Sequence, residues 1–480
     1  MPTESRVLAT EPVATLADYV SQGGGRGLEA ARRLGPTGVI EELEAAGLRG
    51  RGGAGFPTGR KWRTVAENLS PAMPATVVVN AAEGEPGTFK DRAIVRADPY
   101  RVLEGALAAA AALGSDGVIV ALKASFGQEI ARVRAAMAEV REAGWADGVE
   151  MFVVEGPSEY LFGEETALLE VVAGRPPFPR VAPPFRHGVD EAGTAVASAA
   201  SGVEMAGPDA QAMPPALVNN AETFANVAAI LAEGPDWFRS VGTEQSTGTV
   251  VCTVTGRTRR HGVAEFALGT PLGEVIDAIG GGLAPGHEVR AVMSGVATPL
   301  LPGSALDTPV SYEGMEDAGS GLGTGGFIVF DDTTDPAAVA QGVSHFLGVE
   351  SCGQCTPCKQ DGLALDQLLD TLRRSEADED VLAAIESRVA TVSERARCYL
   401  AHQHQRVVDS ILRLFPDELA AHVDGRRGPA RPELIAPILD IADHKAVLDE
   451  DYARKQPDWT FDPQYSGQSP ADRTESSGPS

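Results

Sequence analysis

The sequence predicts an α/β protein built on a parallel sheet, followed by a smaller β module and a helical region. Three observations support this fold class. Short apolar runs alternate with helical periodicity over the first part of the chain, short β-like runs begin near Thr247, and helical periodicity dominates beyond Pro336. Strands that are apolar on both faces and separated by helices are typical of a parallel sheet covered on both sides.

The first part of the chain gives its elements in a regular order. A polar lead precedes a predicted helix over Thr37–Ala46, and a glycine-rich segment, Gly47–Gly59, follows it. Strands and helices then alternate, with strands predicted over Thr76–Asn80, Gly117–Leu122 and Glu150–Gly156 and helices over Val102–Leu113 and Gln128–Ala143.

The rest of the chain changes character several times. Residues 187–216 lack periodicity and are interpreted as an irregular insertion, and the stretch from Gln456 is rich in Ser, Pro, Asp and Gly and is expected to be disordered. With 480 residues the chain suggests about three domains. We expect a lead over 1–36, an α/β domain over 37–245, a β-grasp-like module over 246–334, a helical domain over 335–425, and a partly disordered tail over 426–480.

Composition excludes several classes of protein. The net charge of −27 repels polyphosphate, so nucleic acid is not an expected partner. We find no basic n-region followed by an apolar stretch at the N-terminus and no run of about 18 apolar residues. We therefore expect a cytoplasmic protein without direct membrane insertion, either free or at the cytoplasmic face of a membrane complex.

Four of the five cysteines form one pattern. Cys352, Cys355 and Cys358 have C-x-x-C-x-x-C spacing, and Cys398 follows well downstream. Three evenly spaced thiolates with a distant fourth are typical of iron–sulfur ligands, whereas structural zinc usually pairs two C-x-x-C units. The spacing favours iron–sulfur and leaves zinc as the alternative. Cys252 lies in an apolar β-like run and is expected to be an ordinary buried cysteine.

The segment Gly50–Gly55 matches G-x-G-x-x-G, but it follows a helix rather than a strand, so it does not predict a standard Rossmann dinucleotide site. Small residues still allow backbone N–H groups to approach an anion. A basic island with no acidic residue lies across the same stretch, comprising Arg51, Arg60, Lys61 and Arg63. The segment favours phosphate binding over a plain surface loop.

Two acidic segments follow predicted strands. Asn80, Glu83 and Glu85 come just after an apolar run, at the end of a strand where open α/β sheets bind ligands. These three side chains suit hydrogen bonds with ribose hydroxyls and a carboxamide, although a solvated turn would give the same pattern. Glu164 and Glu165 follow Gly163 in another segment, where an amphipathic helix start with acids near its positive end would give the same pattern.

Five segments together resemble one family. GLRGRGGAGFPTGRKW, NAAEGEPGTFKDR, EYLFGEETALLE, LVNNAETFANV and ESCGQCTPCK occur in the order found in the flavin-binding NADH dehydrogenase subunit of respiratory complex I. Related diaphorase subunits of NAD-linked hydrogenases and formate dehydrogenases share them. The resemblance covers about residues 37–420, and it is the combination of the motifs that makes it specific.

The resemblance implies a Rossmann-like FMN-binding domain, a small β-grasp-like (SLBB) domain and a C-terminal helical bundle that carries a [4Fe–4S] cluster. By resemblance, the cluster ligands are Cys352, Cys355, Cys358 and Cys398. Phe56, Lys61, Glu85 and Glu165 would lie near NADH. FMN would be held by Gly50, Arg51, Gly52, Gly53, Lys61, Asn80, Glu83, Tyr160, Gly163, Glu164, Asn219, Asn220 and Thr223.

The implied function is an NADH-oxidising electron-input subunit. A hydride passes from NADH to FMN, and single electrons continue to the cluster and to a partner, because a flavin converts two-electron into one-electron chemistry. The expected partners are a [2Fe–2S] thioredoxin-like subunit and a larger electron-accepting complex. The alternative is a non-catalytic electron-transfer or assembly subunit that keeps the cluster but has lost flavin and NADH binding.

The chain departs from the family pattern at several places. Ala82 stands where the family has an aspartate, so we expect one flavin hydrogen bond to be lost and FMN to bind more weakly. Arg63 and Thr64 replace a Ser-Phe pair, which removes an aromatic residue expected near the adenine. Tyr399 stands where a small residue is common. These differences indicate a divergent member of the family.

Overall fold

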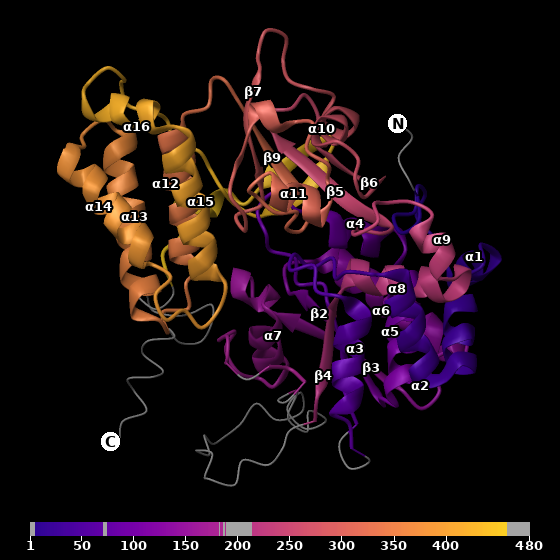
Figure 1. Ribbon diagram of the computed structural model, residues 1–480. Helices are drawn as coiled ribbons and strands as arrows, with labels where there is room; N and C mark the ends of the chain where they lie inside the picture. The colour runs from indigo at the N-terminus through magenta and orange to yellow at the C-terminus, as the bar shows by residue number, and fades with distance from the viewer. Residues whose placement is uncertain (1–4, 71–73, 182, 186–187, 189–213, 458–480) are drawn as a thin grey trace, which may run out of the picture. The chain divides into compact units, whose positions relative to one another are not determined.

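The computed structural model describes residues 5–70, 74–181, 183–185, 188 and 214–457 (Figure 1). They form two compact units. Among the described residues, the parallel-sheet unit comprises those within 5–83 and 91–251, and the C-terminal unit comprises those within 252–457 together with the short segment Gly84–Lys90. Most of the predicted insertion and the end of the predicted tail lie outside the described residues.

The parallel-sheet unit is built on four strands, all parallel, in the order β3-β2-β1-β4. The three predicted strands are confirmed as β1 (Thr76–Asn80), β2 (Gly117–Lys123) and β3 (Glu150–Gly156), and a fourth that was not predicted is β4 (Ala216–Asn220). β1 pairs with β4 in a register that sets Asn80 opposite Asn220. The two strands therefore end side by side.

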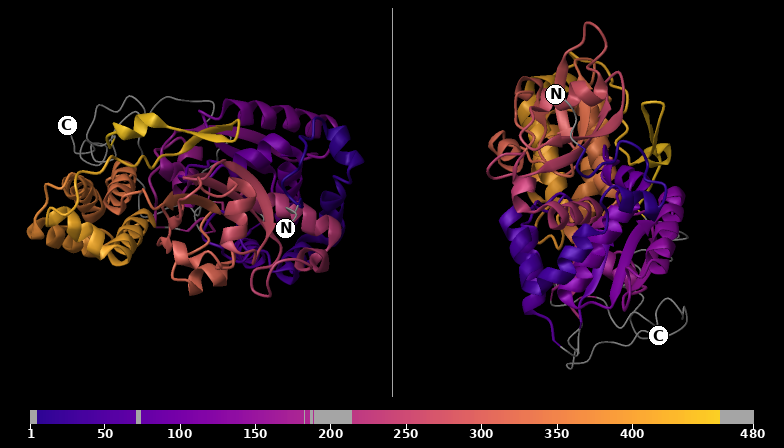
Figure 2. Two further views of the ribbon diagram at one scale, coloured as in Figure 1. Left: turned by 90° about the horizontal axis from the view of Figure 1, so that it is seen from above. Right: turned by 90° about the vertical axis from the view of Figure 1, so that its right-hand side faces the viewer.

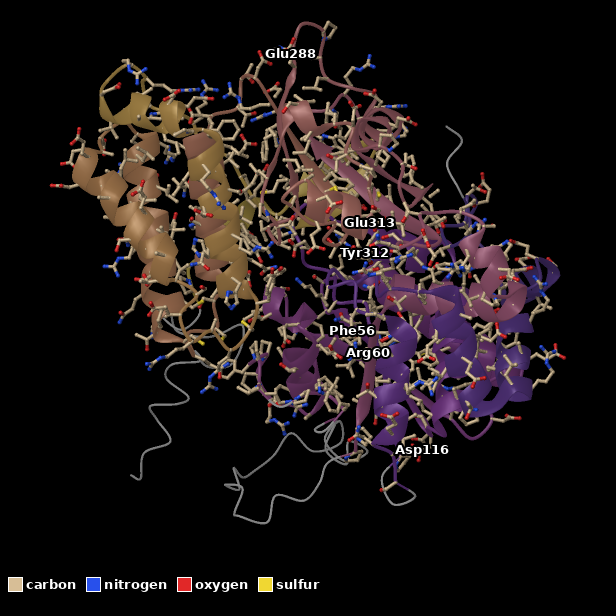
Figure 3. The ribbon with its side chains drawn as sticks, viewed as in Figure 1. Phe56, Arg60, Asp116, Glu288, Tyr312 and Glu313 are labelled. Atoms are coloured by element: carbon tan, nitrogen blue, oxygen red, sulfur yellow. The ribbon has the colours of Figure 1, made fainter. Side chains whose placement is uncertain are left out.

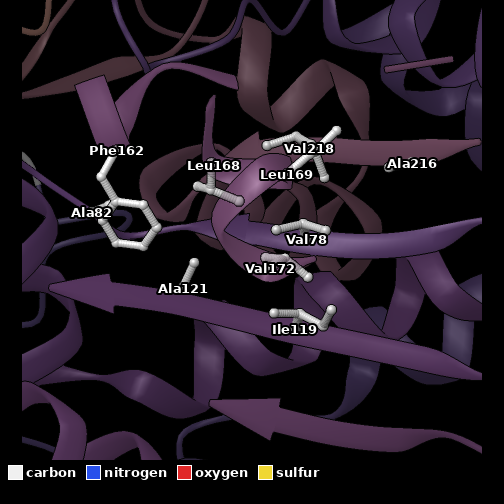
Figure 4. Packing of buried hydrophobic residues seen from close by; sticks show 10 residues of the cluster. All are labelled: Val78, Ala82, Ile119, Ala121, Phe162, Leu168, Leu169, Val172, Ala216 and Val218. Carbon is white, nitrogen blue, oxygen red and sulfur yellow. The ribbon is translucent and has the colours of Figure 1, made fainter. Parts of the chain in front are cut away.

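Helices cover both faces of this sheet, as its apolar strands require. One face carries α5 (Pro99–Leu113) and α8 (Ala221–Glu233), with α6 (Gly127–Glu142) beside β3. The other face packs against α7 (Glu165–Val172) through a buried cluster that includes Val78, Ile119, Val218, Leu168 and Leu169 (Figure 4). The helices predicted over Val102–Leu113 and Gln128–Ala143 are confirmed.

The start of the chain is helical. α1 (Leu16–Ser21) is followed by α2 (Arg26–Ala46), which is kinked at Gly35 before Pro36. The buried carboxylate of Glu104 accepts hydrogen bonds from Tyr19 and from the backbone N–H groups of Gly25 and Leu28, which ties the start of α2 to α5. The polar lead predicted over 1–36 is therefore wrong for the residues of α1 and the first half of α2, because a contact distant in sequence orders them.

Glycines let the helices on this face approach closely. A Cβ on Gly105 of α5 would lie 1.9 Å from the carbonyl oxygen of Phe224 in α8, and one on Gly27 of α2 would lie 2.4 Å from that of Ala228. Any side chain at these two positions would force the helices apart. The remaining elements of the unit are α3 (Thr58–Glu67), α4 (Lys90–Ala97), the 3₁₀ turn η1 (Tyr160–Gly163) and α9 (Pro235–Arg239).

The C-terminal unit begins with a five-stranded mixed sheet in the order β6-β5-β9-β7-β8. β5 runs parallel to β9, and β7 runs antiparallel to both β9 and β8. This arrangement around one main helix agrees with the predicted β-grasp-like module. Its elements are β5 (Thr249–Gly256), β6 (Gly262–Ala267), α10 (Leu272–Gly280), β7 (Val289–Ser294), β8 (Leu301–Pro302), η2 (Gly303–Ala305), α11 (Tyr312–Asp317) and β9 (Gly326–Asp331).

The segment Gly84–Lys90 is held within the C-terminal unit although it follows β1 in sequence. Glu85 accepts a hydrogen bond from Val296 N at 2.6 Å, Thr88 Oγ1 lies 2.8 Å from Thr324 Oγ1, and Phe89 N donates to Thr253 Oγ1 at 3.0 Å. The whole segment is buried. After Glu4 the chain therefore passes between the two units three times.

A bundle of helices follows, as predicted. α12 packs against α13 and α15, and the left view of Figure 2 shows the bundle nearly end-on in orange and yellow. Among the described residues, no helix is both long enough and apolar enough to cross a membrane. The helices are α12 (Pro336–Val349), α13 (Thr356–Arg373), α14 (Glu379–Thr391), α15 (Leu400–Leu414) and α16 (Pro416–Val423).

The described part of the predicted tail contains a hairpin. β10 (Ile438–Ala442) pairs antiparallel with β11 (Lys445–Leu448), and the 3₁₀ turn η3 (Glu450–Ala453) follows. Tyr452 is buried, stacks on Phe346 with 5.4 Å between the ring centroids, and donates a hydrogen bond to Glu350. The expected tail over 426–480 therefore contains a hairpin that the sequence reasoning did not predict, and the stretch from 458 lies outside the described residues.

Candidate functional site

The strand order places a binding crevice in the parallel-sheet unit. β1 leads to β2 and β3 on one side, while β4 lies on the other side of β1. The order of the sheet thus reverses between β1 and β4. In open α/β sheets, ligands bind at the carboxyl ends of the strands where this reversal occurs. The crevice is expected beside Asn80 and Asn220.

The asparagines at these strand ends organise the surrounding backbone. Asn80 donates to Gly163 O at 2.8 Å, which fixes the loop before α7 over the end of β1. Asn220 caps α8 by accepting from Glu222 N at 3.0 Å and donates to Asp91 Oδ2 at 2.7 Å. Asn219 is buried, and in the amide orientation that satisfies both its groups it accepts from Trp62 Nε1 at 3.2 Å and donates to Val218 O at 2.8 Å.

The glycine-rich segment forms a closed loop beside β4. Gly50 N donates to Phe56 O at 2.9 Å, and Arg51 N donates to the hydroxyl of Thr223 in α8 at 2.9 Å. A Cβ on Gly52 would lie 3.3 Å from Asn220 Cβ, and Gly53 has φ 114°, which only glycine adopts readily. The loop therefore brings backbone close to the end of β4.

The basic island separates into different roles. Arg51 is buried, and its guanidinium donates to Arg49 O, Thr247 O and Thr249 O, with Glu222 at 3.8 Å. The Arg51 side chain thus holds the glycine-rich loop to the backbone around Thr247 and Thr249.

The outer members of the island have other partners. Arg63 pairs with Glu44 at 2.6 Å on the surface. Arg60 lies with its guanidinium 5.9 Å from the ring centroid of Phe56, which is 48% exposed (Figure 3). An exposed aromatic ring beside a cation, at the entrance of α3, suits a planar ligand.

Lys61 faces the segment that carries the adjacent glutamates. Its ammonium lies 2.6 Å from Glu165 Oε1 and donates to Val218 O at 2.7 Å. Glu164 caps α7 by accepting from Thr166 N at 3.0 Å and Ala167 N at 2.8 Å, and burial raises the pKa of its carboxyl. Lys61 and Glu165 thus form an ion pair between α3 and α7, and an anion would compete with Glu165 for the lysine.

Glu83 holds the next helix in place. It accepts from Asp91 N at 3.1 Å and lies 3.4 Å from Arg92 Nε, with both side chains buried. Sequence reasoning did not single out Asp91 and Arg92, although both end the quoted motif NAAEGEPGTFKDR. The available signal was an adjacent Asp-Arg pair at the end of that motif.

Ala82 lies in an apolar environment. It is 2% exposed and belongs to the buried cluster that also contains Phe162, Val78 and Ala121 (Figure 4). The ring of Phe162 fills the space beside it so closely that a Cβ on Gly156 would lie 2.2 Å from that ring. A carboxylate at position 82 would be buried among hydrocarbon side chains, which changes the meaning of this departure from the family.

Of the remaining predicted site residues, Tyr160 and Gly163 lie in the parallel-sheet unit and Glu85 lies in the C-terminal unit. Tyr160 and Gly163 form the ends of η1, and a Cβ on Gly163 would lie 3.1 Å from Ala82 O. Glu85 belongs to the C-terminal unit, where it is buried and bonded to Val296 N. A Cβ on Gly295 would lie 2.3 Å from its carboxylate, so that glycine makes room for Glu85.

These residues fit a phosphate-bearing flavin. The ends of β1 and β4 are surrounded by amide groups, the start of α8 and Lys61, and Cβ atoms on Gly52 and Gly163 would lie 3.3 Å from Asn220 Cβ and 3.1 Å from Ala82 O. Helix starts and closely approaching backbone N–H groups bind phosphate, and amides suit the polar edge of a flavin ring.

The cysteines lie at helix starts in the C-terminal unit. Cys355 immediately precedes α13, Cys358 is in its first turn, and Cys398 comes two residues before α15. Arg397 donates to Gln354 Oε1 at 3.0 Å, which joins the segment of Cys398 to the loop of the other three. Helix starts favour negative charge, so both helices suit an anionic thiolate site.

Burial raises the pKa of Cys358 to about 12 and that of Cys352 above its usual value, and the neighbouring cysteines add to both shifts. These thiols would therefore ionise only beside the positive charge of a metal. Gln354 Nε2 lies 3.4 Å from Cys352 Sγ, and Ser351 Oγ lies 3.3 Å from Cys358 Sγ. Cys252 is fully buried, as expected.

The spacing of the sulfurs bears on the choice of metal. Within the described residues, the only group of three or more His, Cys, Asp or Glu whose ligand atoms all lie within 4.8 Å is His287, Asp331 and Asp332. Tetrahedral zinc, with Zn–S bonds of about 2.3 Å, would bring four sulfurs to about 3.8 Å from one another. The choice of an iron–sulfur cluster over zinc therefore rests on the spacing of the cysteines in the sequence and not on the distances between their sulfurs.

Two family models match the chain. The first, the Nuo51 FMN-binding domain, covers residues 43–229, and the second, the NADH-ubiquinone oxidoreductase-F iron-sulfur binding region, covers residues 338–422. The first span contains the crevice and its glycine loop. The second contains all four cysteines.

Curated relatives extend the match over most of the chain. The second of the NADH-quinone oxidoreductase F subunits of Rhizobium meliloti is 34% identical over 427 residues, which cover 86% of this chain and 96% of the relative. The NADH-quinone oxidoreductase F subunit of Mycobacterium tuberculosis is 36% identical over 435 residues, covering 87% and 92%. The F subunit of Streptomyces coelicolor is 33% identical, covering 90% and 93%.

A solved structure of an NAD⁺-reducing [NiFe]-hydrogenase in the H₂-reduced state has the same fold. Its matching chain superposes with a TM-score of 0.72 at 29% identity, covering 86% of this chain and 67% of that one. With relatives above 30% identity over nearly their whole length, the chain belongs to the family of NADH-quinone oxidoreductase F subunits, and it contains the FMN-binding domain and the 4Fe–4S-binding region of that family.

Proposed function

We propose that this chain is the NADH-oxidising subunit through which electrons enter a larger enzyme. The observation that carries the proposal is the occurrence, in one chain of this family, of a reversal of strand order between β1 and β4 with asparagines at the strand ends, and of a four-cysteine set beside two helix starts. FMN, when bound, supplies a two-electron acceptor that can release single electrons. The chain's own residues position the reactants and need not supply an acid or base.

The proposed flavin residues contribute mainly through backbone and amide groups. Asn80 and Asn220 hold the loops that would surround the ring, and Arg51 and Glu83 act through the structure that they stabilise. Lys61 would bind the phosphate after exchanging Glu165 for it, since a phosphate carries more charge. The full set is Gly50, Arg51, Gly52, Gly53, Lys61, Asn80, Glu83, Tyr160, Gly163, Glu164, Asn219, Asn220 and Thr223.

NADH would bind over the same crevice. Phe56 presents an exposed ring for stacking, and Glu165 offers a carboxylate to the adenosine ribose hydroxyls. Lys61 and Glu85 complete the proposed set. Holding the nicotinamide against the flavin is the main catalytic task of these residues, because correct positioning alone contributes several kcal/mol to such reactions.

Cys352, Cys355, Cys358 and Cys398 are the proposed ligands of the [4Fe–4S] cluster. We further propose that electrons leave through a [2Fe–2S] thioredoxin-like partner subunit of a complex on the cytoplasmic side of the cell. We propose that residues 37–245 bind FMN and NADH, that residues 246–334 form the β-grasp-like domain, and that residues 335–425 hold the cluster.

One preparation tests the proposal. Anaerobically purified protein should show a flavin absorption spectrum, contain about four irons per chain and reduce ferricyanide with NADH. Cys398→Ser should lower the iron content, while the matched variant Cys252→Ser should leave it unchanged. Stoichiometric zinc without iron would contradict the cluster assignment.

A flavin titration tests the first site. Lys61→Ala should weaken FMN binding, measured as fluorescence quenching in stripped protein, whereas Arg60→Ala at the neighbouring position should not. The competing function, an electron-transfer subunit without flavin, is motivated by the departures from the family pattern at Ala82 and Thr64. It would be supported if FMN failed to bind even at high micromolar concentration.

A further inference from the structure

A buried carboxylate lies at the start of the cysteine loop. Glu350 is the residue at the carboxyl end of α12, and it precedes Cys352 by two positions. Its side chain is only 1% exposed. Ser351, which lies between the two, has its Oγ 3.3 Å from Cys358 Sγ. Two residues of extended chain span at most about 7 Å, so Glu350 lies in the immediate surroundings of the cysteines.

The end of the chain supplies a positive charge to this carboxylate. Lys455 Nζ lies 2.5 Å from Glu350 Oε1, and the hydroxyl of Tyr452 donates a hydrogen bond to the same oxygen. The lysine ammonium also donates to the tyrosine hydroxyl at 3.1 Å and lies 4.3 Å from the centre of the tyrosine ring. The carboxylate, the hydroxyl and the ammonium therefore form one connected group.

The segment that carries Tyr452 and Lys455 is itself anchored on α12. We define the C-terminal strap as Asp449–Lys455, which includes η3. Tyr452 is 4% exposed, its ring stacks on Phe346, and its carbonyl oxygen lies 2.8 Å from His345 Nε2. Lys455 N donates to the same carbonyl group at 3.3 Å. The place of Lys455 is therefore fixed by the strap as well as by its ion pair.

We propose that Lys455 is a positioning residue that raises the reduction potential of the cluster by neutralising Glu350. This inference rests on the proposed function of the cysteines as ligands of a [4Fe–4S] cluster. The potential of such a cluster depends on the charges around it. A carboxylate without its cation would favour the oxidised cluster, which carries one negative charge less than the reduced cluster. Lys455 offsets this effect, and solvent screens buried charges only weakly.

A redox titration of the anaerobic holoprotein tests the proposal, with dithionite as the reductant and the low-temperature EPR signal of the reduced cluster as the readout. The cluster takes up one electron and no bond is made or broken. Lys455→Met should lower the midpoint potential, because the carboxylate loses its cation. Glu350→Gln should raise it, because the ammonium is then unbalanced. Lys455→Met/Glu350→Gln should return it to near the wild-type value.

Two further variants separate the charge from structural support. Lys455→Arg keeps the charge and should keep the wild-type potential. Lys445→Met removes the same charge from β11, where the ammonium donates to Arg259 O at 3.0 Å, and should leave the potential unchanged. A purely structural role would lower the iron content of the variants without shifting the potentials of Lys455→Met and Glu350→Gln in opposite directions. If one of these two does not keep its cluster, the other decides together with Lys455→Arg.

The outcomes distinguish this proposal from the proposed function. An unchanged potential in Lys455→Met, or shifts of the same sign in Lys455→Met and Glu350→Gln, would overturn the role of the ion pair. If the wild type then still contains about four irons and a reducible cluster, the proposed function stands. Stoichiometric zinc without iron in the wild type would overturn both.

Discussion

At the scale of single residues, Ala82 and Phe162 are best understood together. The sequence predicted that alanine at position 82 removes a flavin hydrogen bond and that restoring aspartate would tighten FMN binding. The structure gives a different reason for the alanine, because its methyl group and the buried ring of Phe162 belong to one apolar cluster. A small apolar residue at position 82 leaves room for a large one at position 162.

Ala82→Asp should therefore destabilise the parallel-sheet unit. Burying a carboxylate without a partner, or expelling Phe162 to solvate it, should cost about 1–3 kcal/mol. The measurement is the free energy of unfolding from urea denaturation, followed by circular dichroism. Ala131→Asp, at an exposed position on α6, is the matched control and should cost less than about 1 kcal/mol.

The same variant also tests whether a carboxylate at position 82 would contact the flavin directly. Ala82→Asp with unchanged stability and tighter FMN binding would mean that the carboxylate reaches the flavin. If the two positions share one space, the double variant Ala82→Asp/Phe162→Ala should lose less stability than the sum of the two single variants, because neighbours in contact depart from additivity.

The carboxylate of Glu165, which pairs with Lys61, predicts a preference for NADH over NADPH. We expect NADH to be used better than NADPH, because a 2′-phosphate near Glu165 would meet a like charge. With the side chain of Glu165 34% exposed, solvent screens part of this repulsion, so we expect about 1–2 kcal/mol, or about 5- to 30-fold in kcat/KM. Glu165→Gln should narrow the ratio and leave Lys61 available to the extra phosphate.

Steady-state kinetics with both nucleotides measure this ratio. Glu170→Gln, on the same helix but paired with Arg175 and Arg180, is the control and should leave the ratio unchanged. Equal use of NADPH by the wild type would refute the assignment of Glu165 to the ribose.

At the scale of elements, helix starts organise both sites. Glu164 caps α7, Asn220 caps α8, and cysteines stand at the starts of α13 and α15. Each start presents unpaired N–H groups and a partial positive charge toward a region where an anion is expected. The fold thereby compensates locally for the strongly negative charge of the whole chain.

The buried His404 should make the stability of the helical bundle depend on pH. It is buried in α15, shares a hydrogen bond of 2.9 Å with Ser344 of α12, and burial lowers its pKa from 6.5 to about 4. The unfolded histidine takes up a proton at higher pH than the folded one, so stability is lost as the pH falls. Between pH 7.5 and 5.5 the loss should be about 1.3 kcal/mol.

Denaturation of the holoprotein at these two pH values measures the effect. His404→Gln can keep the bond to Ser344 but cannot titrate, so its stability should depend less on pH by that amount. His402→Gln, on the more accessible side of the same helix, should keep the wild-type dependence. Identical pH dependence in wild type and His404→Gln would contradict the prediction.

The elements also show which parts of the fold are visible in the sequence. β1, β2 and β3 were predicted because each is an apolar run between turns, and the helices after them because their periodicity is regular. α1 and the start of α2 were missed because Glu104, far away in sequence, orders them. The β10–β11 hairpin was missed because Asp443 and His444, both with positive φ, are a weak turn signal.

For the candidate site, the sequence identified the cysteines, the asparagines and the glycine loop, whose residue types limit what they can do. It did not indicate that Arg51 and Glu83 serve the protein's own backbone. The sequence alone does not distinguish a charged side chain that faces a ligand from one that bonds a backbone group of the protein. Only the fold decides between them.

At the scale of the whole molecule, the division into two units does not follow the order of the sequence. Gly84–Lys90 follows β1 of the parallel-sheet unit but has its hydrogen-bond partners Val296, Thr324 and Thr253 in the C-terminal unit. The chain Met1–Val251 alone should therefore expose this segment. Chymotrypsin should then cleave at Phe89, which is buried in the intact protein.

Mass spectrometry of the limited digest identifies the cleavage. Cleavage at Trp145, in a loop within the parallel-sheet unit, is the internal control and should be equally fast in both chains. Co-expression with residues 252–480 should restore protection at Phe89, which separates loss of the partner from general misfolding. Protection in the isolated fragment would mean that the segment is held by its own unit.

The exchange of this segment has a consequence for how such a gene can change. A recombination that joined the first 251 codons to an unrelated gene would carry away Gly84–Lys90 and leave its binding partners behind. Both products would be defective. One would contain Gly84–Lys90 without its hydrogen-bond partners, and the other would contain those partners without the segment. The boundary that looks like a natural point of exchange along the sequence is thus a poor one, and the two halves are expected to share a single line of descent.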